Sequence, residues 1–254
     1  MTLNKGYEKC AHLYDLFDTK ENIEFFYHYA SESGEILDIG AGTGRIAIPL
    51  AEKGIKVFCI EPSPAMRKEF IRKISKRKKL LANIMLIDSN AISFKLNRTF
   101  PAAFLSGCFD HLLDDRERFL ALSNIGKHLR PNSKLIFDVF LGMMKDSPLS
   151  PSGKVTEDET EYRRYVGGKI LSNKKRETIL VFEKYIHGKL VDRIEEHSLV
   201  GIINRNNIHD LLKKTGFQLT KEFANYDFTR YKQGDPLLIV EAINIKSSPD
   251  LEGY

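Results

Sequence analysis

The chain has 254 residues, of which 42% are hydrophobic, and a formal net charge of +5 at neutral pH. This length allows one large domain with an insertion, and no apolar run approaches the ~18 residues of a membrane-spanning helix. The opening MTLNKGYEKC lacks the apolar core of a signal peptide. Three scattered cysteines, Cys10, Cys59 and Cys108, form no CxxC pair, so we expect reduced thiols in a cytoplasmic protein.

The first half of the chain alternates between apolar runs and helical patterns. Two amphipathic helices are expected within residues 7–31. Strands are then expected at EILDIG (35–40), IKVFCIE (55–61), NIMLID (83–88), AAFLSG (102–107) and KLIFDVF (134–140), with helices at 45–54, 63–79 and 115–129. Pro49 is tolerated only in the first turn of a helix, so its helix should begin at about Gly44 or Arg45. Apolar strands separated by helices are typical of a doubly wound α/β domain with a parallel sheet.

Much of the positive charge lies in residues 67–79, RKEFIRKISKRKK, which hold eight basic side chains. Such a segment suits a nucleic-acid or anionic surface. Met66, Phe70 and Ile74, however, recur every four residues and give the segment one apolar face. Because the sequence offers no second basic surface, we favour a solvated helix over a nucleic-acid footprint.

The pattern changes after residue 143. Residues 144–158, MKDSPLSPSGKVTED, resemble a connector, and strands are expected at EYRRYV (161–166), ETILVFEKYI (177–186) and VDRIEEHSLVGI (191–202), with a tight turn at HGK. We interpret 144–203 as an antiparallel β insertion and substrate lid. A helix at 206–215, capped by Asn206 or Asn207 and ended by Gly216, precedes two strands, FQLTKEFA (217–224) and PLLIVEAINI (236–245). The short gap between them predicts an antiparallel hairpin.

This pattern gives a simple domain organisation. Residues 1–143 and 204–245 should form one ligand-binding domain, in which 1–32 are an N-terminal helical cap. The tail, residues 246–254, is expected to be flexible.

The segment ILDIGAGTGR, residues 36–45, places three glycines between the first strand and the next helix. Such a turn lets a ligand approach the backbone closely. A phosphate-binding Walker loop would need GxxxxGK followed by Ser or Thr, which is absent. A dinucleotide fingerprint, GxGxxG, would need Gly or Ala where Arg45 stands, so a nicotinamide oxidoreductase is disfavoured.

The longer stretch ILDIGAGTGRIAIPLA resembles motif I of the class I S-adenosylmethionine-dependent methyltransferases. Further signals follow in order. Glu61 and PSPAM end the second strand, IDSNAISF (87–94) is similar to the family's GDAxxLPF, and HLRPNSKLIFDVF (128–140) is similar to its entry into strand five, with Asn132 and Ser133 in place of two glycines. The resemblance covers roughly residues 33–142 and 204–245. It departs at FPAAF, where an Asp commonly precedes strand four.

The resemblance implies a Rossmann-like, doubly wound seven-stranded sheet with an antiparallel last strand, and S-adenosyl-L-methionine as cofactor. The implied cofactor-binding residues are Asp38, Gly40, Ala41, Gly42, Glu61, Pro62, Met66, Asp88, Ser89 and Phe109. Glu61 would accept from the ribose hydroxyls, and Asp88 from the adenine amino group. Asp38, a carboxylate within an apolar strand, needs donors from the loop or from the ammonium of the cofactor. For Met66, packing in the helix core is favoured over contact with the adenine.

The methyl group should lie over the carboxyl ends of strands one and four. The segment SGCFDHLLD (106–114) places Asp110 and His111 there, and His111 is a candidate base, although a backbone-bonded histidine is the alternative. Tyr14 is a candidate to close over the methyl site, or to pack on the domain. The loop NYDFTRYKQGD (225–235) fits either an acceptor pocket or a packed hairpin. No metal site is expected.

We therefore expect a methyltransferase that moves a methyl group to a small-molecule acceptor, mainly through proximity and orientation. One alternative is an RNA or protein methyltransferase that uses the basic segment 67–79. Against it, the sequence lacks the [DN]PP[YF] tetrapeptide of base-amine methyltransferases and any RNA-binding motif known to us. Another alternative is a regulator that binds S-adenosylmethionine without turnover.

Overall fold

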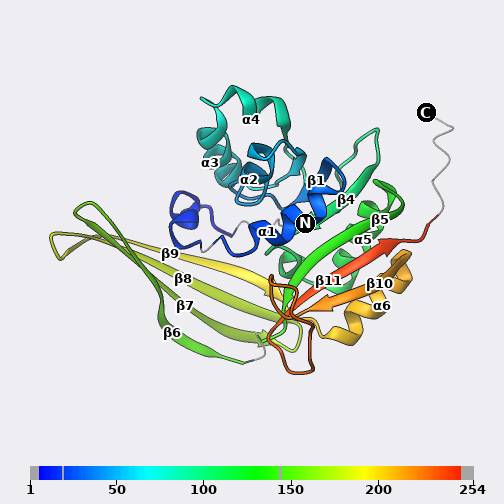
Figure 1. The fold of residues 1–254 in the computed structure, drawn as a ribbon. Coiled ribbons are helices and arrows are strands. Elements are labelled where there is room, and N and C mark those ends of the chain that lie inside the picture. Colours follow the sequence, from blue (N-terminus) through cyan, green and yellow to red (C-terminus); the bar gives the residue numbers. More distant parts are fainter. Residues whose placement is uncertain (1–5, 19, 143–144, 247–254) are drawn as a thin grey trace.

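The computed structural model describes residues 6–18, 20–142 and 145–246 (Figure 1). One sheet has seven strands in the order β10-β11-β5-β4-β1-β2-β3, and a second, antiparallel sheet has the order β6-β7-β8-β9. Figure 1 shows the N-terminal segment, in blue, between α3 and the antiparallel sheet. Apart from Lys246, the expected flexible tail lies outside the described residues.

The seven-stranded sheet confirms the predicted α/β class. Its strands are β1 Glu35–Ile39, β2 Lys56–Ile60, β3 Ile84–Ile87, β4 Phe100–Leu105, β5 Leu129–Phe140, β10 Phe217–Phe223 and β11 Leu237–Asn244. Strands β1 to β5 pair in parallel, whereas β11 pairs antiparallel with both β5 and β10. The last strand is therefore antiparallel, as expected.

Helices cover both faces of this sheet. They are α1 Ile23–Ser31, α2 Ala47–Glu52, α3 Pro64–Ile74, α4 Lys78–Asn83, α5 Asp115–Lys127 and α6 Arg205–Thr215. One core cluster packs α5 and α6 against the sheet, and the other packs α1 to α4 against the opposite face. Apolar strands buried on both faces are what two helical layers require.

Several helix boundaries differ from the prediction. The helix after the glycines begins at Ala47, because Gly44 has φ +84°, which is incompatible with a right-handed helix. Pro49 is then its third residue, where no intrahelical donor is needed. The helix expected at 63–79 is two helices, because Arg77 takes ψ 82° between them. The first N-terminal helix is the 3₁₀ helix η1, Ala11–Phe17.

The insertion contains one more strand than predicted. Its strands are β6 Ser147–Glu157, β7 Thr160–Ser172, β8 Lys175–Ile186 and β9 Lys189–Gly201. The supposed connector was wrong: it contains β6, an edge strand paired only with β7, where Pro148 and Pro151 are tolerated at two register shifts. The turn His187–Gly188, with φ 49° and 74°, confirms the tight hairpin between β8 and β9.

The basic segment forms an ordinary amphipathic surface. Met66, Phe70 and Ile74 are buried, as predicted. Four of its cations form ion pairs: Arg67 with Asp88, Arg72 with Glu69, Lys73 with Asp15, and Arg77 with Glu52. Within the described part of the chain, no helix is both long and apolar enough to cross a membrane.

Candidate functional site

A cavity of about 620 Å³ lies at the carboxyl ends of β1, β2, β3 and β4. The strand order reverses between β1 and β4, which is where open α/β sheets bind ligands. Its volume is within the range of small-molecule sites. The loop after β1 forms its floor, and Tyr7 and Tyr14 reach it from the N-terminal segment.

Gly42 and Gly44 have different structural roles in the loop. Gly42 has φ +58°, and a Cβ built on it would meet no protein atom closer than 4.0 Å, so this position leaves space beside the backbone. Gly44 has φ +84°, and a Cβ there would lie 2.6 Å from the Phe70 ring, so its missing side chain lets α3 approach the loop. The first feature suits a ligand and the second suits packing.

Asp38 lines the cavity as a buried and incompletely paired carboxylate. It is 2% exposed, and its Oδ2 has no hydrogen-bond partner among the described residues. Burial, with a smaller effect of the Glu61 charge, raises the pKa of Asp38 to about 7, against the lowering effect of Arg45. A buried carboxylate of a cavity-lining residue with one unpaired oxygen would be stabilised by a cationic ligand group such as an ammonium.

Glu61 organises the loop from the end of β2. Its carboxylate accepts from the backbone N–H of Gly42 and of Ser63, both at 2.8 Å. Burial raises the pKa of Glu61, and these two N–H donors oppose that shift. Because Glu61 also lines the cavity, it presents a carboxylate acceptor next to the loop.

Most of the remaining predicted cofactor residues line the cavity. Gly40, Ala41, Pro62 and Met66 line the cavity. Asp88 also lines it, but its side chain is 72% exposed and pairs with Arg67 at 2.6 Å. Ser89 lies outside the lining, which continues instead from Asn90 to Ser93; Asn90 Oδ1 accepts from two backbone N–H groups and shapes this turn.

Phe109 is also placed differently from the prediction. It is fully buried outside the cavity lining, and its ring stacks on Phe137 at 4.5 Å. Cys108 lines the cavity, but its thiol donates to the Ile39 carbonyl at 3.0 Å and burial raises its pKa well above the ordinary value. Both features indicate a packing role for the Cys108 thiol.

His111, Tyr7 and Tyr14 lie close together in the lining of the cavity. Tyr7 contacts Tyr14 and His111 edge-on, with ring centroids 5.2 and 5.9 Å apart. Burial lowers the pKa of His111, while a hydrogen bond with the backbone of Leu199 opposes this shift. Burial thus favours the neutral imidazole, which is held by β9. Both catalytic candidates line the cavity that holds Asp38.

Comparison with known proteins shows similarity to methyltransferases. Residues 36–132, less than half of the chain, match the family model of a methyltransferase domain. An uncharacterized methyltransferase of Bacillus thuringiensis is 28% identical over 145 residues, which are 53% of this chain and 65% of that protein. The chain thus matches about 65% of the length of this curated relative.

Solved methyltransferases share the fold. The CcbJ methyltransferase of Streptomyces caelestis superimposes with a TM-score of 0.79 at 15% identity, over 97% of this chain and all of that one. CalS10 of Micromonospora echinaspora, an amino pentose methyltransferase solved with S-adenosylmethionine, gives a TM-score of 0.69 at 17% identity, over 90% and 91%. The two matches include most of the insertion, because each covers at least 90% of this chain.

Sequence reasoning missed a polar network below the cavity. Arg45 and Ser106 both line the cavity, and the Arg45 guanidinium donates to Ser106 Oγ at 3.1 Å. Asp138, buried on β5, accepts from the N–H of Gly107 at 2.6 Å and from the hydroxyl of Tyr226 at 2.9 Å. Arg45 follows the glycine motif directly, which was an available signal; the position of Asp138 was visible only in the fold.

The network also decides between the two interpretations of loop 225–235. Tyr226 is bound to Asp138, and the Phe228 ring lies 4.7 Å from the Phe25 ring in a cluster with α1. Loop 225–235 is therefore a packed hairpin loop. Among the residues that the structure describes, no group of three or more His, Cys, Asp or Glu side chains is arranged to hold a metal ion.

Proposed function

We propose that this chain transfers the methyl group of S-adenosylmethionine to a small-molecule acceptor bound in the same cavity. The observation that carries the proposal is Asp38, whose buried carboxylate lines the cavity with one oxygen unpartnered among the described residues. A buried charge without a partner is costly, so the site fits a ligand that brings a cation.

The cavity residues fit the three polar parts of this cofactor. Asp38 would face its ammonium group, Arg45 its carboxylate and Glu61 its ribose hydroxyls. When bound, the cofactor supplies a methyl group already activated on a sulfonium. Gly42 leaves room beside the backbone for the methionine half.

The acceptor end supports an amine as the nucleophile. An amine is protonated in water and must lose its proton before it can attack. The neutral imidazole of His111 is a base that can accept this proton, and Tyr7 and Tyr14 provide aromatic walls that exclude water. The carboxylates of Asp38, Glu61 and Glu117 line the same cavity and favour a cationic amine on entry. The amino pentose methyltransferase CalS10 is a neighbour with this kind of acceptor.

The insertion, 144–203, would close the acceptor side. Leu199 of β9 hydrogen-bonds His111, and η1 packs on the same sheet through Leu13, Leu180 and Phe182. The insertion would therefore hold the base and the aromatic wall in place. Ion pairing of four cations in the basic segment removes much of the support for an RNA acceptor.

A labelled-cofactor assay tests the proposal. Purified protein is incubated with S-adenosylmethionine labelled in its methyl group and with a panel of small amines that includes amino sugars. The panel also holds matched hydroxyl analogues and bulk RNA. We expect label in the amines alone, and calorimetry should show binding of the cofactor but not of NAD.

The variant His111→Asn is the matched test of the base. It should lower kcat for the amine by about 10²-fold or more while leaving the Kd of the cofactor unchanged. Label in RNA would replace the proposal with the nucleic-acid alternative. Cofactor binding without transfer to any acceptor class would favour the non-catalytic regulator.

A further inference from the structure

The N-terminal segment is attached to the insertion by apolar packing. Cys10 and Leu13 form a buried cluster with Leu180 and Phe182, and Phe17 packs on Phe182 at 5.7 Å between ring centroids. The Lys9 N–H also donates to Glu196 Oε2 at 2.8 Å. Since separating this contact would expose apolar surface, η1 and the antiparallel sheet form one unit.

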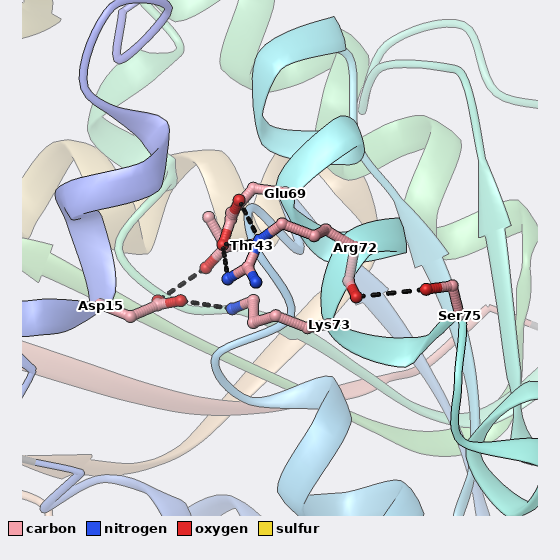
Figure 2. A network of polar contacts seen from close by, with 6 residues as sticks. All are labelled: Asp15, Thr43, Glu69, Arg72, Lys73 and Ser75. Carbon is pink, nitrogen blue, oxygen red and sulfur yellow. Dashed lines mark hydrogen bonds and ion pairs between the residues drawn. The ribbon is translucent and has the colours of Figure 1, made fainter.

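The same segment is attached to the glycine loop by polar contacts centred on Asp15. Asp15 Oδ1 accepts from the Thr43 hydroxyl at 2.7 Å, and Oδ2 pairs with the ammonium of Lys73 on α3 (Figure 2). Thr43 is fully buried between Gly42 and Gly44. One carboxylate therefore joins η1, the glycine loop and α3. We call the residues Asp15, Thr43 and Lys73 the Asp15 clasp.

The surroundings of the clasp determine which cation pairs with Asp15. The Arg72 guanidinium, the other nearby cation, is bound to both oxygens of Glu69 at 2.6 to 3.0 Å, as Figure 2 shows. This leaves Lys73 as the ion-pair partner of Asp15. A longer ion pair, 3.6 Å between a guanidinium nitrogen of Arg45 and Asp18 Oδ1, lies at the end of the same segment.

The clasp is also the weaker of the two attachments of η1. The Asp15 side chain is 35% exposed, so water and salt compete for its ion pair with Lys73. The apolar contact with the insertion has no such competitor. Separation should therefore occur between η1 and the glycine loop, with η1 remaining packed on the insertion.

We propose that Asp15 is a positioning residue that holds Tyr14, its neighbour in the chain, over the glycine loop and so controls release of the nucleoside product. Tyr14 and Thr43 both line the cavity, and the clasp fixes the separation between them. Opening the clasp withdraws Tyr14 and uncovers the methionine half of the ligand. This inference rests on the proposed function, because it takes the cavity to be the cofactor site.

The test measures dissociation of the demethylated product, S-adenosylhomocysteine, by stopped-flow displacement. Asp15→Asn keeps the shape and an acceptor for Thr43 but loses the ion pair, and Asp15→Ala loses both contacts. We expect release about tenfold faster in Asp15→Ala and roughly threefold faster in Asp15→Asn. Lys73→Met, which leaves Thr43 and Asp15 untouched, should match Asp15→Asn.

Glu52→Gln is the matched control, because it removes a similar ion pair, with Arg77, away from the cavity. It should leave the release rate unchanged. Raising the salt concentration to 0.5 M should speed release from the natural protein but not from Asp15→Asn, a readout that a merely structural role would not move. Should Asp15→Ala fail to fold, Asp15→Asn and Lys73→Met decide the outcome.

Two failures are distinguishable. If the natural protein binds neither S-adenosylmethionine nor its product, the proposed function is wrong. If it binds the product but Asp15→Asn and Lys73→Met release it at the natural rate, the cavity is the cofactor site and Asp15 does not position its cover.

Discussion

The carboxylate of Asp38 is almost completely buried. Its neighbours on the strand are apolar, and the charge of Glu61 raises its pKa further, while only Arg45 opposes this. A carboxyl whose pKa is about 7 is largely protonated at pH 5.5 and half ionised at pH 7. The ligand-binding form is the ionised one, because only a carboxylate attracts an ammonium.

Affinity for S-adenosylmethionine should therefore increase with pH. Between pH 5.5 and 7.0 we expect the association constant to rise roughly tenfold, since binding the ammonium requires loss of the Asp38 proton. Calorimetry at several pH values measures this. In Asp38→Asn the slope should vanish and the affinity should remain low at every pH. An unchanged slope in that variant would assign the titration to another group.

The local motif predicted part of the site. Asp38, Gly42 and Glu61 line the cavity because the strand, the turn and the next strand end fix their positions over a few residues. Ser89 and Phe109 could not be placed in the same way. Ser89 lies in an irregular segment and Phe109 begins a three-residue 3₁₀ helix, and in both places the side-chain direction depends on packing. Tyr7 was missed because the approach of the N-terminal segment is a tertiary contact, whereas the position of Arg45 directly after the glycine motif was an available signal.

At the scale of elements, prediction succeeded where an element is stabilised by its own pattern. The parallel strands are apolar on both faces and the helices between them are amphipathic. β6 was missed because its prolines indicate a loop unless the strand is known to lie at an edge. The 3₁₀ geometry of η1 has no distinct periodicity in seven residues, so a helix was expected there.

The start of α6 offers a test of boundary assignment. The structure places the cap at Asn204, whose Oδ1 accepts from the Asn207 N–H at 2.9 Å, and not at Asn206 or Asn207 as the sequence suggested. Asn204→Ala should lower the free energy of unfolding by about 1 kcal/mol, because an orphan helical N–H loses its acceptor. Asn206→Ala should change it by less than about 0.5 kcal/mol. Chemical denaturation of both variants compares them, and equal losses would contradict this boundary.

At the scale of the whole molecule, the half-buried Asp110 and the buried Asp138 interact near the place where the domain meets the insertion. Asp110 Oδ1 has no partner among the described residues, and its Oδ2 accepts from the Phe140 N–H at 3.4 Å, at the end of β5. Burial, together with the charge of Asp138, raises the pKa of Asp110 to about 7. Between about pH 4 and pH 7 the folded protein keeps a proton that the unfolded chain has released, so this group makes folding less favourable as pH rises through that window.

Replacing Asp110 with Asn should remove that penalty. The stability of Asp110→Asn relative to the natural protein should therefore increase between pH 5 and pH 7.5, by about 1–3 kcal/mol. Thermal or urea unfolding at both pH values gives the difference. A difference that does not vary with pH would mean that Asp110 is ionised in the folded state throughout the range.

The contact between Lys9 and Glu196 joins residues that are 187 positions apart. During synthesis on the ribosome, the segment that holds Lys9 must wait until β9 has been made before this contact can form. Until β8 has been made, Cys10 and Leu13 also lack their apolar partners Leu180 and Phe182. The cover of the cavity is thus translated long before the strands on which it docks.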